Sequence, residues 1–369
     1  MWKTTTVILV LSIGLYHLIF QYELVKPNLP ETFWGPEKNK AASKDVRPFK
    51  IDVPKSVIDD LNKRLENPRL NVEPLEGAAW TYGFPAPYLK KIIAYWHNKY
   101  NWTERQSLLN KYPQFYVQGG DWGAVITSSM AVLYPENVIG LHSNMCIYNK
   151  PLNFWNILGM FLPSLVVEKQ YEHRMYPFKD HFYRLMEETG YMHLQATKPD
   201  TIGLALTNSP VSLAGYILEK FNTWTNPEYK NRKEGGLLEK FTLDELLDNV
   251  MIYWVTDSMT TSARLYAEQF THKYRDLQID ELPIDVPSAC AIFPHELAYT
   301  PEKILRMRYL NLIQLNHMPG GGHFAAMEEP VIFADDIYDF VGKIMEQSKN
   351  EDRKKTVVTE QDNKKPKST

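Results

Sequence analysis

The chain has 369 residues, of which 44% are hydrophobic, 13% are aromatic and 23% are charged. This composition is typical of a globular protein, and the length allows two to three compact units or one core with an inserted domain. The formal net charge is -3 and no stripe of lysine and arginine is interleaved with aromatic residues, so nucleic acid is not expected as a partner. The ten histidines show no metal-ligand spacing and there is no CxxC motif, so no metal site is expected.

The two cysteines, Cys146 and Cys290, each lie in a short apolar run. Such surroundings favour buried free thiols over a disulfide, and free thiols are typical of a reducing compartment. We therefore expect most of the chain to face the cytosol.

The N-terminal residues Thr4 to Phe20 are apolar and almost uncharged, and Lys3 precedes them. Two interpretations fit this segment, a cleaved signal peptide and an uncleaved anchor, and its length is near the short end of the roughly 17 to 25 residues that span a membrane. No clear cleavage site of small residues follows, and aromatic residues at its end suit a membrane interface. We predict a single-pass anchor at residues 1–22 and a connector at residues 23–47.

From Pro48 the apolar residues follow helical spacing, so residues 48–112 are predicted to form an N-terminal helical segment. Its expected helices are Val53–Leu65, Pro87–Tyr100 and Trp102–Leu109. Next come an expected strand at Phe115–Gln118, a helix at Ala124–Tyr134 and a strand at Val138–Met145. Residues 113–150 are therefore predicted to begin an α/β core.

Residues 151–275 are rich in aromatic residues and methionine and are predicted to form a helical lid over an apolar substrate, although an ordinary helical core fits the same pattern. The expected helices are Lys179–Glu188, Ser212–Thr223, Thr242–Trp254 and Ser258–Phe270. Residues 276–347 are predicted to complete the core, with strands Ser288–Phe293 and Leu310–Leu315 and a helix at Asp336–Met345. Residues 348–369 are charged and lack aromatic side chains, so a disordered tail is expected.

The segment Gly119–Gly123 places Asp121 between glycines two positions to either side, in a tight turn between the expected strand and helix. A nucleophile elbow has this arrangement, because its sharp turn strains the central residue and requires small neighbours. An aspartate at the tip of such a turn forms an ester between substrate and enzyme. A glycine-rich turn with a solvated aspartate fits the same five residues.

Two later residues fit such an elbow. Glu296 comes just after the expected strand Ser288–Phe293, where an α/β enzyme places a catalytic carboxylate. His323 lies in a glycine-rich loop after the expected strand Leu310–Leu315, which can bring the imidazole to the same sheet edge. The alternatives are a surface acid and an ordinary loop histidine. Three such residues in the order nucleophile, acid, histidine favour the triad of the α/β-hydrolase fold.

These segments resemble the microsomal-type epoxide hydrolases, and more closely the insect juvenile hormone epoxide hydrolases. The resemblance extends from Phe49 to Gly342. The segments that carry it are Pro48–Asn110, Gln118–Gly123, Leu141–Met145, Lys198–Thr201, Leu206–Phe221, Phe293–Glu296 and Gly321–Ala326. The resemblance implies an α/β-hydrolase fold with a helical lid and an N-terminal helical segment. It also implies hydrolysis of an apolar epoxide to a vicinal diol, without a cofactor.

The resemblance implies the residues of the first chemical step. Asp121 attacks a ring carbon, while Tyr191 and Tyr266 of the lid donate hydrogen bonds to the epoxide oxygen. Composition alone does not select these two among the 22 tyrosines.

The resemblance also implies the second step, in which water hydrolyses the ester on the aspartate. Glu296 orients His323, which is the general base, and the backbone N–H of Trp122 is one donor to the oxyanion. The family takes its second donor from a His-Gly-x-Pro loop, and this chain has no His-Gly dipeptide.

The interval between Asn110 and Phe115 is too short for the family's core. Several strands with crossovers precede the nucleophile strand in an α/β-hydrolase, and each βαβ unit takes roughly 30 residues or more. We therefore predict that an internal block of about 100 residues, about three such units, is absent, and with it the first half of the central sheet. Activity is expected to be low or absent for this reason.

Three hypotheses remain at this point. The first is an epoxide hydrolase of the juvenile hormone class, at the endoplasmic reticulum or microsomal membrane with its catalytic part in the cytosol. The second is a catalytically inactive shortened isoform or truncated gene model that at most binds an apolar ligand. The third is a haloalkane dehalogenase, which also uses an aspartate at the elbow but needs halide-binding donors in place of the paired tyrosines.

Overall fold

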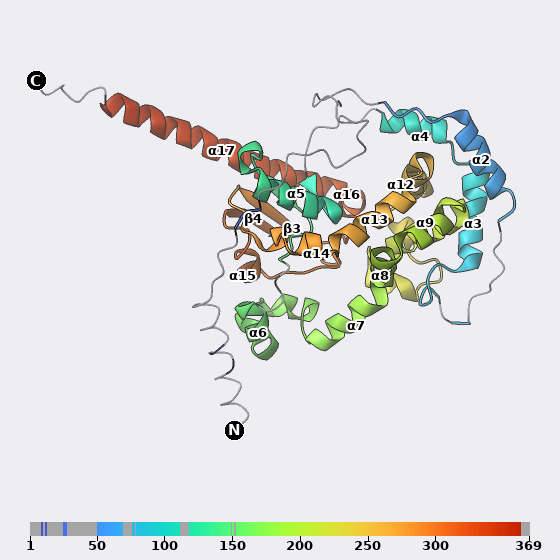
Figure 1. Ribbon diagram of the computed structural model, residues 1–369, viewed down its shortest axis with the longest axis horizontal. Coiled ribbons are helices and arrows are strands. Elements are labelled where there is room, and N and C mark those ends of the chain that lie inside the picture. The colour runs from blue at the N-terminus through green and yellow to red at the C-terminus, as the bar shows by residue number, and fades with distance from the viewer. Residues whose placement is uncertain are drawn as a thin grey trace, which may run out of the picture. The chain divides into compact units, whose positions relative to one another are not determined.

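The computed structural model describes residues 9, 12, 25–27, 50–68, 76–77, 79–110, 118–148, 150 and 153–362, with side chains up to residue 347 (Figure 1). The described residues form two compact units. Unit 1 takes residues 9 and 12 and those within 117–182 and 280–362, and unit 2 takes residues 25–27 and those within 50–110 and 183–279. The predicted N-terminal helical segment thus shares a unit with most of the predicted lid.

A parallel sheet forms the centre of unit 1. Its strands are β1 (Gln118–Gly119), β2 (Leu141–Ser143), β3 (Ser288–Ile292) and β4 (Leu312–His317), in the spatial order β1-β2-β3-β4. Within the described residues β1 is therefore an edge strand that pairs only with β2. The four expected strands are confirmed with shorter or shifted bounds, and the first part of the expected strand before the elbow, 115–117, lies outside the described residues.

Unit 1 also contains the following helices, in chain order. They are α5 (Trp122–Leu133), α6 (Phe154–Phe161), α7 (Phe178–Glu188, which continues into unit 2), α15 (Glu302–Leu305), α16 (Ala325–Glu328) and α17 (Pro330–Asp362). The last helix, α17, is joined to β2 and β4 by a polar cluster around the buried Asp336. His142 Nε2 lies 2.8 Å from Asp336 Oδ2, and Asn316 Nδ2 donates to Asp336 Oδ1 at 2.6 Å. The cluster is stabilising because each buried carboxylate oxygen has a partner.

The C-terminal part of the chain corrects one prediction. The predicted disordered tail, 348–369, is wrong for residues 348–362, because α17 continues through Asp362. Residues 343–362 contain no glycine or proline, and their lysines, glutamates and glutamines are good helix formers. In residues 348–362, a high content of charged residues and a lack of aromatic residues therefore did not indicate disorder.

The cysteines correct a second prediction. Cys146 and Cys290 form a disulfide with a Cα–Cα distance of 5.9 Å, so the prediction of free thiols is wrong. The parallel pairing of β2 and β3 sets Ser143 opposite Cys290, and the chain brings Cys146 back to the same place three residues later. The expectation of a cytosolic location loses its support from the cysteines.

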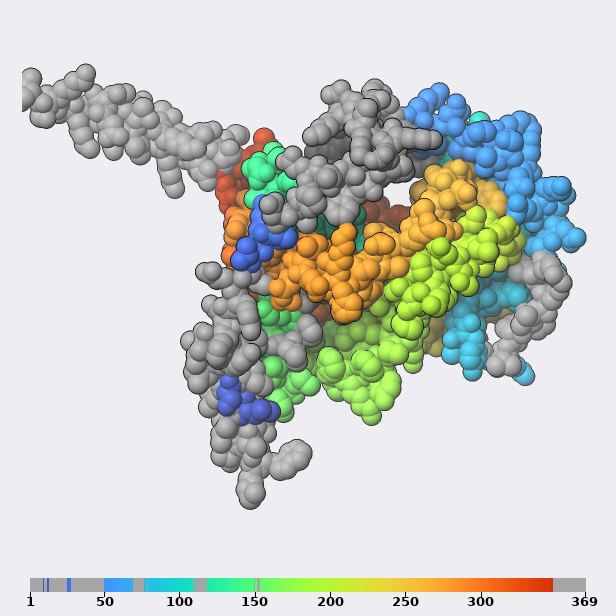
Figure 2. Space-filling view, in the orientation of Figure 1, coloured from blue at the N-terminus to red at the C-terminus, as the bar shows by residue number. Residues whose placement is uncertain are grey.

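Unit 2 is helical. Its helices are α2 (Lys55–Leu65), α3 (Ala86–Asn98), α4 (Trp102–Leu109), α8 (Gly190–Thr197), α9 (Pro199–Thr207), α10 (Pro210–Leu218), α11 (Lys220–Thr223), α12 (Leu243–Thr256), α13 (Met259–Gln269) and α14 (His272–Arg275). In the space-filling view the surfaces of α8 and α9 lie against α13 (Figure 2). The expected helices of this unit are confirmed, except that the single helix expected at Ser212–Thr223 is divided between α10 and α11.

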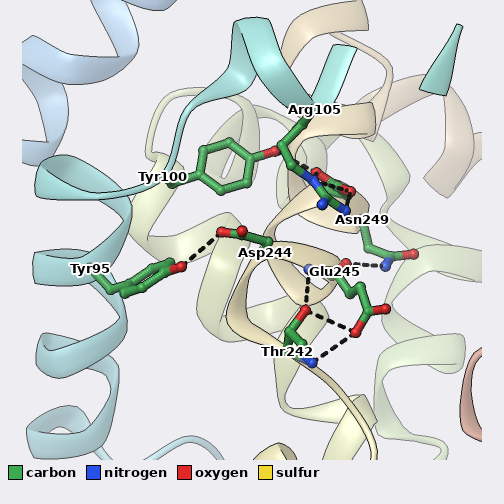
Figure 3. Close-up of polar contacts among 8 residues, drawn as sticks. Tyr95, Tyr100, Arg105, Thr242, Asp244, Glu245 and Asn249 are labelled. Atoms are coloured by element: carbon green, nitrogen blue, oxygen red, sulfur yellow. Dashed lines mark hydrogen bonds and ion pairs between the residues drawn. The ribbon is translucent and has the colours of Figure 1, made fainter. Parts of the chain in front are cut away.

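Polar contacts join the N-terminal helical segment to α12 (Figure 3). Tyr95 donates to Asp244 at 2.9 Å, and Tyr100 donates to Asp248 at 2.6 Å. Arg105 Nε donates to the same carboxylate of Asp248 at 2.9 Å. Because Asp248 is buried, this paired charge holds α4 and α12 in one arrangement.

The predicted anchor at residues 1–22 lies outside the described residues, apart from Leu9 and Ser12. No single helix in the described part of the chain has both the length and the apolar composition that a membrane span requires. Helix α9 and the following helical segment of α10 and α11 reach the length and apolar composition of a membrane span only when they are counted together, and the chain bends sharply between them.

We predict that Leu141→Ala in β2 destabilises the protein by about 2–5 kcal/mol, because this side chain is 1% exposed and its removal leaves a cavity. Leu310→Ala is the matched control in the same unit, since Leu310 is 56% exposed and its loss changes stability by less than about 0.5 kcal/mol. Urea unfolding followed by circular dichroism measures both. Equal effects of the two substitutions would contradict the described core.

Candidate active site

The turn between β1 and α5 holds Asp121 in a strained conformation, with φ 48° and ψ -126°. A positive φ is rare for residues other than glycine, and such strain persists only where the surroundings enforce it. A Cβ on Gly119 would lie 2.2 Å from the carbonyl oxygen of Gly123, and one on Gly120 would lie 2.5 Å from Asn144 Oδ1. The sharp turn therefore depends on the glycines before Asp121, whereas a Cβ on Gly123 meets nothing within 4 Å.

The turn is also fixed from β2. Gln118 Nε2 donates to Asn144 Oδ1 at 2.7 Å, so the last strand residues before the elbow are tied to the loop after β2. Asn144 is buried and packs against Gly120. The sequence had shown Asn144 only as part of a family-like segment, and its contact depends on the parallel register of β1 and β2.

Three side chains from different strand ends meet beside this turn. His323 Nδ1 lies 2.7 Å from Glu296 Oε1, and His323 Nε2 lies 3.7 Å from Asp121 Oδ1. The side chains of His323 and Glu296 are buried, while that of Asp121 is 46% exposed. A carboxylate only accepts hydrogen bonds, so Nδ1 carries a proton toward Glu296 and Nε2 faces Asp121. The geometry is that of a nucleophile, a base and an orienting acid.

The loops that carry Glu296 and His323 are joined by their backbones. Met318 donates its N–H to the carbonyl of Ile292 at 2.9 Å, and His295 donates to the carbonyl of Gly321 at 3.1 Å. Gly321 has a φ of 93°, which favours glycine, and a Cβ there would lie 2.8 Å from the ring of Phe293. These contacts fix the spacing between the acid and the imidazole.

Electrostatics make His323 a stronger base than an isolated imidazole. Burial alone lowers its pKa, because it penalises the charged imidazolium. The negative charges of Glu296, Asp121 and Glu328 outweigh burial, so the pKa of His323 is raised above its ordinary value of 6.5. Asp121 also lies at the N-terminus of α5, where the helix dipole favours negative charge.

Glu328 is a residue that the sequence analysis did not select. It is buried on α16, and its two oxygens accept from the backbone N–H groups of Gly322 and Phe324, at 2.6 Å and 2.8 Å. These two residues flank His323. The sequence offered a weak sign, since an acid follows the histidine after about one helical turn, but only the fold brings that acid back onto the loop.

The two predicted lid tyrosines lie together in unit 2. The ring centroids of Tyr191 on α8 and Tyr266 on α13 are 5.8 Å apart, with an interplanar angle of 80°. The ammonium group of Lys220 lies 4.8 Å from the centroid of the Tyr191 ring. The structure thus pairs the two tyrosines that resemblance had selected from distant parts of the sequence.

The remaining predictions for the site concern Trp122 and metals. Trp122 is the first residue of α5, directly after Asp121, so its N–H belongs to the helix N-terminus. Within the part of the chain that the structure describes, no group of three or more His, Cys, Asp and Glu side chains could hold a metal ion.

Comparisons with known proteins agree on one family. The family model described as epoxide hydrolase N terminus matches residues 46–127. Juvenile hormone epoxide hydrolase 1 of the flea Ctenocephalides felis is 41% identical over 90% of this chain and 93% of the flea protein. Epoxide hydrolase 1 of Sus scrofa is 34% identical over 94% of this chain and 100% of the pig protein. The crystal structure of juvenile hormone epoxide hydrolase from the silkworm Bombyx mori matches with a TM-score of 0.82 at 34% identity, covering 86% of this chain and 99% of that chain.

The alignment with the flea protein has more positions than this chain has residues to fill them, so it contains gaps on the side of this chain. It spans 434 positions, whereas 90% of 369 residues is about 332 residues. About 100 aligned positions therefore have no residue from this chain. This number agrees in size with the absent block of about 100 residues that the sequence predicts.

We predict that Gly119→Ala and Gly123→Ala have opposite effects on stability. The first forces a Cβ against the backbone of Gly123 and costs about 1–3 kcal/mol or more, as overpacking does. The second adds a methyl group in open space within a helix and stabilises by up to about 1 kcal/mol. Urea unfolding of the two variants tests this, and equal tolerance of both would mean that the elbow is not as described.

Proposed function

Because this chain belongs to the epoxide hydrolase family and has the α/β-hydrolase fold, we propose that it opens an apolar epoxide of the juvenile hormone class through an ester on Asp121. The observation that carries the proposal is the position of His323, with Nδ1 on Glu296 and Nε2 toward Asp121. The product is a vicinal diol, and no cofactor takes part.

In the first half-reaction, Asp121 forms a bond to one ring carbon as the bond from that carbon to the epoxide oxygen breaks. The developing alkoxide accepts hydrogen bonds from Tyr191 and Tyr266, and one of these residues supplies the proton that completes the hydroxyl group. The strained turn supports this role because it presents the carboxylate half-exposed at the end of β1.

In the second half-reaction, His323 Nε2 takes a proton from water and the resulting hydroxide attacks the ester carbonyl of Asp121. Glu296 holds the imidazole and stabilises its charged form. The N–H of Trp122 and the dipole of α5 stabilise the oxyanion. Breaking the bond between the carbonyl carbon and the alkyl oxygen expels an alkoxide, which takes the proton of the newly formed carboxylic acid, so the diol leaves and Asp121 is a carboxylate again. The proton on His323 then returns through solvent to the tyrosine that gave up its proton in the first half-reaction.

We propose further that this activity is impaired. The family's second oxyanion donor belongs to the predicted absent block, and loss of one such donor costs about 2.7–4 kcal/mol, or 10²–10³-fold in rate. The oxyanion forms only when the ester is hydrolysed. The second half-reaction is therefore slowed more than the first.

A non-catalytic product is the second candidate. It is favoured by the edge position of β1 within the described sheet and by the roughly 100 aligned positions that this chain does not fill. In that case the chain binds an apolar ligand at most. Sequencing of the transcript across the Asn110–Phe115 junction separates a real shortened isoform from a truncated gene model.

We propose the substrate class from the relatives and the composition of the chain, and the location from its N-terminal sequence. Juvenile hormone epoxide hydrolases among the relatives and the aromatic composition of residues 151–275 favour an apolar terpenoid epoxide. The apolar segment Thr4 to Phe20 favours attachment to the endoplasmic reticulum or microsomal membrane.

The proposed function predicts an ester on Asp121 after incubation with a terpenoid epoxide. Peptide mass spectrometry is expected to find the mass of the epoxide added to that carboxylate. The ester persists longer in His323→Gln, because this variant lacks the base, and does not form in Asp121→Ala. Absence of any adduct from folded wild-type and His323→Gln proteins would support the non-catalytic candidate.

Hydrolysis of the ester is expected to accelerate as pH rises. The neutral imidazole is the base, and the pKa of His323 is raised above 6.5, so the base becomes available only at higher pH than for a free histidine. The decay of the adduct at a series of pH values measures this. A rate independent of pH between about 6 and 8 would exclude His323 as the base.

The tyrosine pair predicts a defect in the first half-reaction. Tyr191→Phe and Tyr266→Phe each slow ester formation by about 10²–10³-fold, the effect of losing one donor to a developing oxyanion. Tyr82→Phe is the control, because Tyr82 is 80% exposed in the same unit. Ester formation at the wild-type rate in both lid variants would remove these residues from the mechanism.

A further inference from the structure

Glu328 is a buried acid that neither proposed half-reaction uses. Its residue is 5% exposed, and it lies at the last position of the short helix α16. Burying a carboxylate is costly unless hydrogen bonds compensate for the lost water. Both oxygens have such bonds, from backbone N–H groups on either side of His323. A costly buried charge is thus directed at the one loop that carries the proposed base.

The two bonds leave the loop little freedom. Oε2 accepts from Gly322 at 2.6 Å and Oε1 accepts from Phe324 at 2.8 Å, so one rigid carboxylate fixes the peptide groups before and after His323. On its other side, the imidazole is fixed by Glu296 at 2.7 Å. The base is therefore held at both its backbone and its side chain.

We propose that Glu328 is a positioning residue, whose carboxylate bridges the N–H groups of Gly322 and Phe324 and thereby holds the His323 imidazole between Glu296 and Asp121. The importance of this role for catalysis rests on the function proposed above, but the bridge itself does not. A carboxylate is suited to the task because it offers two acceptors and no donor. A glutamine in its place offers one oxygen, and its amide group turns a donor toward the second N–H.

The charge of Glu328 adds a second effect. The pKa of Glu328 is raised to about 7, chiefly by burial, and the N–H groups of Phe324 and Gly322 oppose the rise. Glu296 contributes to the rise in this pKa and His323 opposes it, and Asp121 acts on the same imidazole. Because ionised Glu328 favours the imidazolium, its removal lowers the pKa of His323.

A purely structural role is the alternative. Phe324 precedes α16 as its N-cap, so Glu328 could serve only to stabilise that short helix. Loss of stability in a variant would not distinguish the two roles. Titration of the His323 ring does, because helix stabilisation alone does not set the pKa of the base.

The test is NMR titration of the full chain with labelled histidine, glycine and phenylalanine, comparing wild type, Glu328→Gln and Asp335→Asn. Asp335 is an exposed acid on α17 and is the matched control. In the wild type, the amide signals of Gly322 and Phe324 are expected to titrate near pH 7, as protonation of Glu328 weakens one of the two bonds. In Glu328→Gln this step disappears and the His323 ring titrates at a pH lower by about one unit, whereas Asp335→Asn matches the wild type.

The result that overturns the proposal is equally specific. If Glu328→Gln leaves the His323 titration unchanged, or if the two wild-type amides show no titration step separate from that of the His323 ring at any pH where the protein is folded, Glu328 does not position the base. The wild-type amide titration keeps the test decisive even where the variant does not fold. None of these readouts requires turnover, so an inactive chain would refute the proposed function without deciding this inference.

Discussion

The site depends on the register of four short parallel strands. β1, β3 and β4 all end at the same edge of the sheet, and the loops that follow them carry Asp121, Glu296 and His323. In a parallel sheet such an edge is where residues distant in sequence can meet. This register places the His323 imidazole 2.7 Å from the Glu296 carboxylate and 3.7 Å from the Asp121 carboxylate. A shift of one residue in any strand would separate the three groups.

The strand that precedes Asp121, β1, has few strand neighbours in the part of the chain that the structure describes. Within the described residues β1 pairs only with β2, so its other edge lacks a strand. On α5 and its C-cap residue, Ile126, Met130 and Tyr134 follow a four-residue spacing and are 51%, 38% and 53% exposed. An open strand edge and an exposed apolar helix face are what the loss of neighbouring βαβ units leaves behind. The turn at Asp121 is strained, while the strand before it has one strand neighbour within the described residues.

The sequence alone predicted most helices and the strands from the spacing of apolar residues. It predicted the triad from the glycines around the turn and from the order of the three residues along the chain. Helix α5 and residues Asp121, Glu296 and His323 are examples. The features that the sequence did not predict depend on contacts between segments that are far apart in the chain. The Cys146–Cys290 disulfide follows from the pairing of β2 with β3, and the bridge made by Glu328 follows from the path of the loop before α16. Tyr191 and Tyr266 could be predicted only from the resemblance to a known family, because a single tyrosine on a helix has no distinctive sequence pattern around it.

We propose that the triad still forms the ester but hydrolyses it slowly. Rapid mixing with a terpenoid epoxide, followed by quenching at successive times, measures the ester on Asp121 and the free diol in the same samples. Ester is expected to accumulate to a large fraction of the protein before diol appears, since the oxyanion of the second step lacks one donor. Diol formation as fast as in a full-length relative, with no accumulation of ester, would contradict it.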